Sequence, residues 1–137
     1  MVQHITIHCR DLVEAAEREI ETVTVEQARA MHGRDDVVMI DIRDIRELER
    51  DGRVPGAFHC PRGMLEFWID PQSQYHKPVF AQDKTFLFFC AGGLRSALAA
   101  QTAHRMGLKP VAHIGGGFAA WRDAGGPVEK WEPKKKG

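Results

Sequence analysis

Runs of apolar residues alternate along this chain with segments in which apolar positions recur at helical spacing. The clearest run covers residues 85–89, TFLFF, and is apolar at every position after the first. Such a run is typical of a strand that is buried on both faces in the middle of a parallel sheet. Three shorter runs are predicted as further strands, over residues 37–42, 57–60 and 111–114.

Capping residues and helical spacing mark the helices between these strands. A helix is predicted over residues 11–20, whose first residue, an aspartate, is the expected N-cap. Thr24 with Gln27, and Asp44 with Glu47, have the spacing of a capping box, in which two side chains satisfy free amides at a helix start. Two more helices are predicted toward the C-terminal end, over residues 96–106 and 118–124.

This alternation of strand and helix predicts an α/β fold, with a parallel sheet covered by helices on both faces. One connection departs from the pattern, because residues 61–78 lack a clear period and hold several aromatic side chains. Connections of this length often act as functional lids or walls. Arg62, Phe67 and Trp68 could therefore line a pocket, although core packing is the favoured interpretation for the two aromatic residues.

Length and charge narrow the classes of function. The 137 residues are about one domain in length. Nineteen basic residues balance nineteen acidic ones, which disfavours nucleic acid or an anionic membrane as a partner. The apolar runs are far shorter than the ~20 residues of a membrane span, and the first twenty residues lack the apolar segment of a secretory signal. We therefore expect a cytoplasmic protein, with the basic residues 134–136 forming a solvated tail.

The cysteines and histidines do not have the spacing of a metal site. Three cysteines are an odd number without zinc-finger spacing, so neither a disulfide framework nor a metal centre is predicted. The seven histidines are scattered, and no metal or other cofactor is expected. Cys9 and Cys60 precede neither a glycine turn nor a helix start, and both are interpreted as packing residues.

Cys90 differs from the other two cysteines, because it ends the predicted central strand and precedes a turn with two glycines. In an open parallel sheet, ligands bind beyond the carboxyl ends of the strands. The glycines allow successive backbone N–H groups to face one centre, and the turn leads into a helix whose dipole attracts negative charge. Together with Arg95, these groups favour a thiolate over a thiol. Cys90 is therefore predicted to be a nucleophile.

Four segments carry motifs of one known family. The sequence CAGGLRS at residues 90–96 resembles the active-site loop of the rhodanese (thiosulfate sulfurtransferase) family, which reads Cys, two variable residues, Gly, one variable residue, Arg, then Ser or Thr. The other three segments follow the order of the family: DIRD at 41–44 resembles its Asp-x-Arg turn, VPGA at 54–57 its Ile-Pro-Gly-Ala segment, and GGFAAW at 116–121 its closing Gly-Gly-Phe-x-x-Trp signature. The chain departs from the family at Arg53, where histidine is frequent.

The resemblance implies a three-layer α/β/α rhodanese-like fold with a five-stranded, mainly parallel central sheet. Residues 22–128 would form the rhodanese domain, preceded by an N-terminal helical extension at 1–21 and followed by a basic C-terminal tail at 129–137. It also implies a sulfurtransferase in which Cys90 carries sulfane sulfur as a persulfide. The sulfur would come from a small anionic donor such as thiosulfate and pass to cyanide, a thiol or a protein acceptor.

The remaining loop residues would bind the substrate through their backbone amides; they are Ala91, Gly92, Gly93, Leu94, Arg95 and Ser96. Ser96 either gives its hydroxyl to the sulfur or caps the following helix, and the sequence leaves both roles open. Asp41 and Arg43 are expected to pair or cap locally, and thereby to hold the active-site end of the sheet in shape.

Two other functions would use the same residues. Cysteine-dependent phosphatases have a similar loop, but their phosphate ring needs five residues between Cys and Arg, whereas four separate Cys90 from Arg95. The shorter ring suits a sulfur atom better than a phosphoryl group. A non-enzymatic sulfur carrier or protein-binding module would retain every residue named above, so the sequence leaves open the choice between carrier and enzyme, the physiological donor and acceptor, and the oligomeric state.

Overall fold

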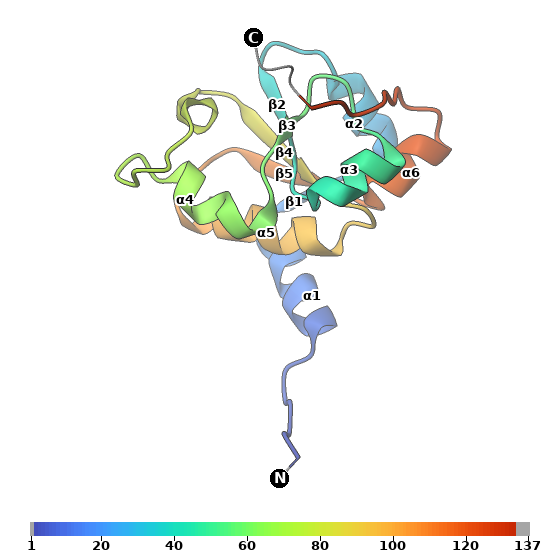
Figure 1. Cartoon of the computed structure of the whole chain (residues 1–137). Helices are drawn as coiled ribbons and strands as arrows, with labels where there is room; N and C mark the ends of the chain where they lie inside the picture. The colour runs from blue at the N-terminus through green and yellow to red at the C-terminus, as the bar shows by residue number, and fades with distance from the viewer. Residues whose placement is uncertain (1, 134–137) are drawn as a thin grey trace.

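A computed structural model describes residues 2–133 of the chain. Across those residues, five strands form one parallel sheet in the order β1-β5-β4-β2-β3. The strands are β1 (Glu21–Val23), β2 (Val37–Asp41), β3 (Phe58–His59), β4 (Thr85–Phe89) and β5 (Val111–Ile114). Helices cover both faces of the sheet (Figure 1), which confirms the predicted three-layer α/β/α architecture.

Strand β4 lies at the centre of the sheet, between β2 and β5. Phe86 and Phe88 pack in the apolar cluster on one face, and Leu87 and Phe89 pack in the cluster on the other. All four side chains are fully buried. Burial on both faces explains why this strand is apolar at consecutive positions, and its bounds are the predicted ones.

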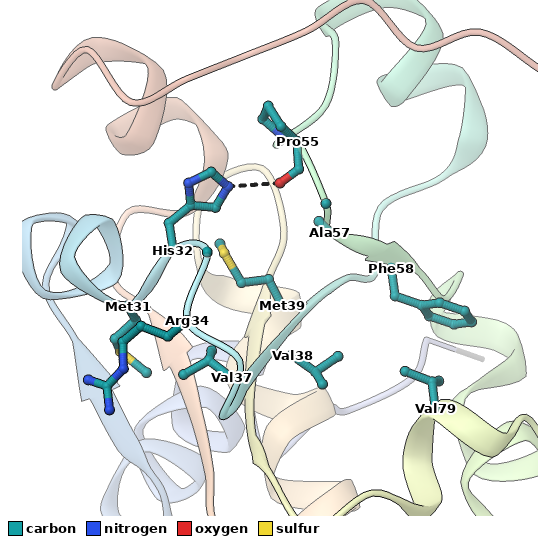
Figure 2. Close-up of a pocket in the computed structure, with 12 residues that line it drawn as sticks. Met31, His32, Arg34, Val37, Val38, Met39, Pro55, Ala57, Phe58 and Val79 are labelled. Carbon is teal, nitrogen blue, oxygen red and sulfur yellow. Dashed lines mark hydrogen bonds between the residues drawn. The ribbon is translucent and has the colours of Figure 1, made fainter.

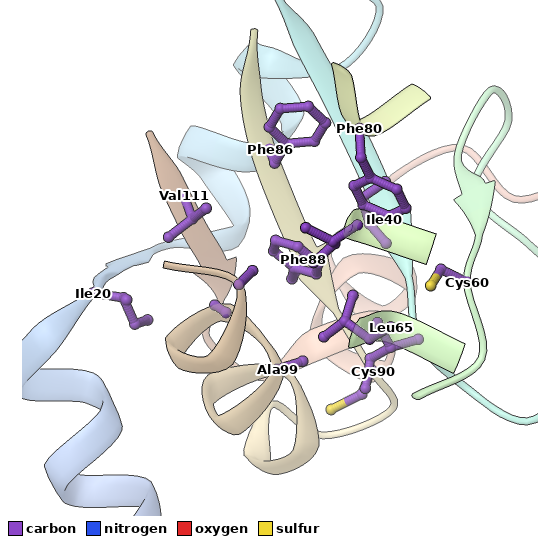
Figure 3. Packing of buried hydrophobic residues seen from close by; sticks show 14 residues of the cluster. Ile20, Ile40, Cys60, Leu65, Phe80, Phe86, Phe88, Cys90, Ala99 and Val111 are labelled. Atoms are coloured by element: carbon purple, nitrogen blue, oxygen red, sulfur yellow. The ribbon is translucent and has the colours of Figure 1, made fainter. Parts of the chain in front are cut away.

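One face of the sheet is covered by α4 (Leu65–Ile69) and α5 (Leu94–Arg105). Figure 3 shows Leu65 and Ala99 of these helices in the same cluster as Phe88 and Cys90. The α5 residues in this cluster are alanines, and small side chains let the helix approach the aromatic strand closely.

Helix α1 (Cys9–Glu19) packs on the outer side of α5. Val13 and Ala16 of α1 form a small buried cluster with Ala97. At the end of α1, the Glu19 carboxylate accepts hydrogen bonds from α5 side chains, Gln101 and Arg105. The predicted N-terminal extension is therefore docked on its own domain, and its expected boundary at residue 21 falls inside β1.

The other face of the sheet is covered by α2 (Val25–Met31) and α6 (Gly117–Asp123). Trp121 of α6 is fully buried, and its indole N–H donates to the carbonyl of Pro127 at 2.8 Å. Helix α3 (Ile45–Asp51) follows β2. The capping boxes predicted at the starts of α2 and α3 are both present.

One strand was missed, and two local expectations are wrong. Strand β1 went unpredicted, because it is three residues long and buries only Val23. The connection expected to be irregular contains a helical turn η1 (Arg62–Met64) and α4, and it ends in a second turn, η2 (Pro78–Ala81). Helix α1 begins earlier than predicted: His8 is its N-cap, and Asp11 is an interior partner of the capping box whose carboxylate accepts the His8 N–H at 2.8 Å.

Two further expectations concern membrane spans and the C-terminal tail. No helix within residues 2–133 combines the length and apolar character needed to cross a membrane. The basic residues 134–136, predicted as a solvated tail, lie outside the described residues.

Candidate active site

Cys90 directly follows the carboxyl end of β4, and the turn after it leads into α5, which begins at Leu94. The Gly93 backbone N–H donates a hydrogen bond to the Cys90 Sγ at 3.1 Å, and the Ser96 Oγ lies 3.6 Å from the same sulfur. Because α5 has twelve residues and points its N-terminus at the loop, its dipole favours negative charge on the sulfur.

Two glycines hold the loop in this conformation. Gly93 has a φ of +97°, in the left-handed region, and precedes the first residue of α5. Gly117 has a φ of +59°, and a Cβ atom there would lie 2.5 Å from the Cys90 carbonyl oxygen. This close approach lets Phe118 N–H donate to that oxygen at 2.8 Å, while Ala119 N–H donates to Ala91 at 3.0 Å. The start of α6 therefore fixes the first two peptide groups of the loop.

Arg95 provides a fixed positive charge at the edge of the loop. Its guanidinium donates two hydrogen bonds of 2.9 Å to the Glu47 carboxylate of α3. These bonds to Glu47 raise the pKa of Arg95 above its ordinary value, and the neighbouring Cys90 sulfur adds a smaller contribution in the same direction. In turn, Arg95 lowers the pKa of Glu47. The pair links the loop to α3, with the Arg95 side chain still half-exposed.

The other predicted loop residues divide between the inner and outer sides. Gly93 and Ser96 are buried against the sulfur, Ala91 is half-buried, and Gly92 and Leu94 are exposed. Leu94 also borders a cavity of about 410 Å³ between α1 and the start of α5. Cys90 itself is only 1% exposed, so the loop surface covers the sulfur in this conformation.

Asp41 and Arg43 form the expected pair, which is buried next to the Cys90 loop and is not part of it. Both are fully buried, and Arg43 donates to the two carboxylate oxygens of Asp41 at 2.8–3.2 Å. The guanidinium also donates to the Gly52 carbonyl at 2.9 Å and lies over the Phe118 ring, 4.1 Å from its centroid. The pair therefore connects the carboxyl end of β2 with the helix that fixes the Cys90 carbonyl.

Arg62, Phe67 and Trp68, which the sequence analysis considered as possible pocket walls, lie outside the Cys90 loop. Trp68 packs edge-on against Phe58, and Phe67 packs edge-on against Tyr75 at the surface. Arg62 binds the Glu66 carboxylate at 2.9 Å. Within the described residues, neither the 410 Å³ cavity nor a second cavity of about 400 Å³ is lined by Arg62, Phe67 or Trp68.

The second cavity lies away from the Cys90 loop, at the amino-terminal end of β2. Figure 2 shows Val37, Val38 and Met39 along one side of it. His32 closes another side, with its Nε2 2.8 Å from the Pro55 carbonyl oxygen. The predicted nucleophile has no part in this cavity.

The sequence analysis missed a buried histidine that joins the loop. The His113 Nδ1 of β5 lies 3.0 Å from the Ser96 Oγ, and its Nε2 lies 3.0 Å from Thr22 Oγ1 and 3.2 Å from Glu17 Oε2. Burial lowers the pKa of His113, while Glu17 acts in the opposite direction. One signal could have revealed it: histidine is the polar residue within the otherwise apolar run VAHI at 111–114.

The other two cysteines have different surroundings. Cys60 is fully buried, and burial raises its pKa to about 12. The packing role predicted for Cys60 is therefore confirmed. Cys9 is exposed at the first turn of α1, so the packing role predicted for it is wrong.

The family model for the rhodanese-like domain matches residues 24–124, which is most of the chain and includes the Cys90 loop. The chain belongs to the rhodanese-like domain family. This confirms the resemblance found in the four sequence motifs, and the matched segment lies inside the predicted domain at 22–128.

Three similar proteins illustrate the range of this family. A protein of unknown function from Rhodopseudomonas palustris, described as a possible tyrosine phosphatase, is 64% identical and has a TM-score of 0.92, over 94% of this chain and 99% of that one. The polysulfide-sulfur transferase homodimer of Wolinella succinogenes is 27% identical with a TM-score of 0.66, over 88% and 85% of the two chains. The mouse thiosulfate sulfurtransferase/rhodanese-like domain-containing protein 3 is 25% identical over 104 residues. That match covers 72% of this chain and 66% of the mouse protein, just under two thirds of its length.

Proposed function

We propose that this rhodanese-like domain is a sulfurtransferase that carries sulfane sulfur on Cys90. The observation that carries the proposal is the position of Cys90 Sγ at the start of α5, where it accepts the Gly93 N–H at 3.1 Å. Membership of the family and the sulfur-transferring relatives support the same reaction. Cys60 is buried in the core, where burial raises the pKa of its thiol, and Cys9 lies on α1, outside the loop of residues 90–96.

The first half-reaction loads the cysteine. The Cys90 thiolate attacks the outer sulfur of a small anionic donor such as thiosulfate, a new S–S bond forms, and the donor's own S–S bond breaks. Sulfite leaves with the electron pair of that bond. The Gly93 amide, the dipole of α5 and the Arg95 charge stabilise the incoming anion and the resulting persulfide, as preorganised donors do in an oxyanion hole.

The second half-reaction removes the terminal sulfur from Cys90. A thiophilic acceptor, such as cyanide or a thiolate, attacks the terminal sulfur of the Cys90 persulfide. The S–S bond breaks, the acceptor keeps the terminal sulfur, and the electron pair returns to the cysteine as a thiolate. In both steps the exposed loop residues Leu94 and Arg95 form the surface that the substrates meet first.

Intact-mass measurement after thiosulfate treatment tests this proposal. We expect a gain of one sulfur atom that disappears when cyanide is added and that is absent in Cys90→Ser. Cys9→Ser is the matched control and should gain the sulfur like the wild type, because Cys9 lies outside the loop. A chain that gains no sulfur from any sulfane donor would contradict the proposal.

The same experiment separates an enzyme from a sulfur carrier. An enzyme releases thiocyanate repeatedly when thiosulfate and cyanide are both in excess, and the rate is proportional to protein concentration. A carrier would transfer about one sulfur per chain and then stop. We expect repeated turnover, because Arg95 supplies a charge for a small anionic donor at the loop edge.

A cysteine-dependent phosphatase is the second candidate, favoured by the description of the Rhodopseudomonas palustris protein. The spacing of the loop argues against it here. Four residues separate Cys90 from Arg95, whereas the phosphate ring of a cysteine-dependent phosphatase needs five. Cys90-dependent hydrolysis of p-nitrophenyl phosphate would support the phosphatase, and we expect none.

A further inference from the structure

A continuous chain of polar side chains runs from the buried Cys90 sulfur toward the surface. Ser96 is 3.6 Å from the sulfur and 3.0 Å from the Nδ1 of His113, whose Nε2 is 3.2 Å from the Glu17 carboxylate. Cys90, Ser96 and His113 are each at most 1% exposed, whereas the Glu17 side chain is 39% exposed. The chain therefore connects a sealed sulfur atom with solvent.

Hydrogen-bond chemistry allows two complete proton arrangements along this chain. With a thiol at Cys90, the S–H donates to Ser96 Oγ, the Ser96 hydroxyl donates to Nδ1 of a neutral His113, and the Nε2–H donates to Glu17. With a thiolate at Cys90, the Ser96 hydroxyl donates to the sulfur, and Nδ1–H of an imidazolium donates to Ser96. In both arrangements every group has a partner of the right kind.

From this geometry we infer that Ser96, His113 and Glu17 form a proton relay that deprotonates Cys90 as it attacks its substrate. The S–H proton moves to the Ser96 oxygen while the Ser96 proton moves to the Nδ1 of His113, so no proton is lost or gained. The Glu17 carboxylate holds the imidazole in position and stabilises the imidazolium that forms. Glu17 and His113 are positioning residues, since they act on the sulfur through Ser96.

The relay uses an element that the family match does not include. The matched segment begins at residue 24, whereas Glu17 belongs to α1 and Thr22 belongs to β1. Thr22 Oγ1 lies within reach of both His113 Nε2 and Glu17 Oε2, at 3.0 and 3.4 Å. Docking of α1 on α5 thus completes the polar chain behind the cysteine, and this inference rests on the sulfurtransferase function proposed above.

The charges around the relay favour transfer of the proton from Cys90 toward His113. Glu17 is the carboxylate that faces the imidazole from α1, and Arg95 is the cation that lies near the sulfur at the other end. From α5 and β1 the contacts are the neutral hydroxyls of Ser96 and Thr22, and on the β4 side His113 is paired in register with the apolar Phe88. Burial lowers the pKa of His113 and so favours the neutral imidazole before the reaction, whereas the Glu17 carboxylate acts in the opposite direction and favours the imidazolium that forms.

The test is the pH profile of Cys90 alkylation by iodoacetamide in the full chain, followed by peptide mass mapping. His113→Asn keeps a hydrogen-bonding group for Ser96 but no longer accepts a proton. We expect Cys90 alkylation in this variant to be about tenfold slower at about pH 7, with the profile displaced to higher pH, because a general base has been lost. Equal profiles in wild type and His113→Asn would overturn the relay.

Glu17→Gln provides a second test at a partly exposed position, which is informative even where the buried His113→Asn variant does not fold. It should slow alkylation at about pH 7 by about threefold, because the imidazolium loses its carboxylate. Glu14→Gln, one turn earlier on the same helix, is the matched control and should behave as wild type. An unchanged Glu17→Gln profile would overturn the role of α1.

Sulfur loading from thiosulfate is measured on the same samples to separate the two proposals. Wild type that loads sulfur, combined with unshifted alkylation profiles, would leave the sulfurtransferase standing and remove the relay. Shifted profiles in a chain that accepts no sulfur would keep the relay and remove the sulfurtransferase.

Discussion

At the residue scale, the geometry around Cys90 depends on positions without side chains. Gly117 adopts a left-handed φ and brings the start of α6 against the Cys90 carbonyl, which then accepts the Phe118 N–H. Gly93 adopts the same type of conformation and aims its own N–H at the sulfur. The proposed nucleophile is therefore positioned by main-chain groups, and the Ser96 hydroxyl lies 3.6 Å from its sulfur.

Gly117→Ala should destabilise the protein by about 3 kcal/mol, because the new Cβ meets the Cys90 carbonyl oxygen at 2.5 Å and the backbone must leave a left-handed conformation. Gly125→Ala is the matched control: Gly125 has a φ of +81°, but a Cβ there has no neighbour within 4 Å. It should cost only about 1 kcal/mol of backbone strain. Urea unfolding measures both values, and equal losses in the two variants would show that the contact with Cys90 is unimportant.

At the element scale, the sequence predicted the strands and helices whose burial follows a regular pattern along the chain. Strand β4 is buried on both faces, so its apolar run was unambiguous. Strand β1 buries only Val23, and α4 lies in an aromatic connection without a visible helical period. Such short elements are formed by tertiary contacts rather than by their own sequence pattern.

The docking of α1 on α5 is the element contact with the most direct consequence for the site, because it brings Glu17 to His113. Ala16 is fully buried in this contact, so Ala16→Leu should push the helices apart and destabilise the protein by about 2 kcal/mol. Ala15→Leu, at a half-buried neighbouring position, should cost at most about 0.5 kcal/mol. Thermal unfolding compares the two, and an Ala16→Leu protein as stable as the wild type would contradict tight docking.

At the scale of the whole molecule, the candidate site combines a part that the sequence shows and a part that the topology creates. The loop from Cys90 to Ser96 is continuous in sequence, so its motif and its place after a strand were readable. Glu17 lies 96 residues from His113 along the chain. They meet because β5 lies between β1 and β4 in the sheet, and hydrophobic periodicity predicts strands without predicting their order.

Because the Cys60 thiol is buried, we expect the free energy of unfolding of the whole molecule to change with pH in the alkaline range. Its pKa is about 12 in the folded chain, against an ordinary value of 9.0, so between these values the unfolded chain has released the proton that the folded chain keeps. The free energy of unfolding therefore falls as pH rises above about 9, by up to about 1.4 kcal/mol per pH unit from this group. Cys60→Ala lacks the group, although it loses packing in the core at every pH.

The measurement is the difference in unfolding free energy between wild type and Cys60→Ala, obtained by urea titration at about pH 8 and about pH 10.5. Ionisable groups that the two proteins share contribute equally and cancel in this difference. We expect wild type to be the more stable protein at the lower pH and its advantage to shrink by about 2 kcal/mol at the higher pH. A constant difference across this range would mean that the folded chain does not hold the Cys60 proton more tightly than the unfolded chain does.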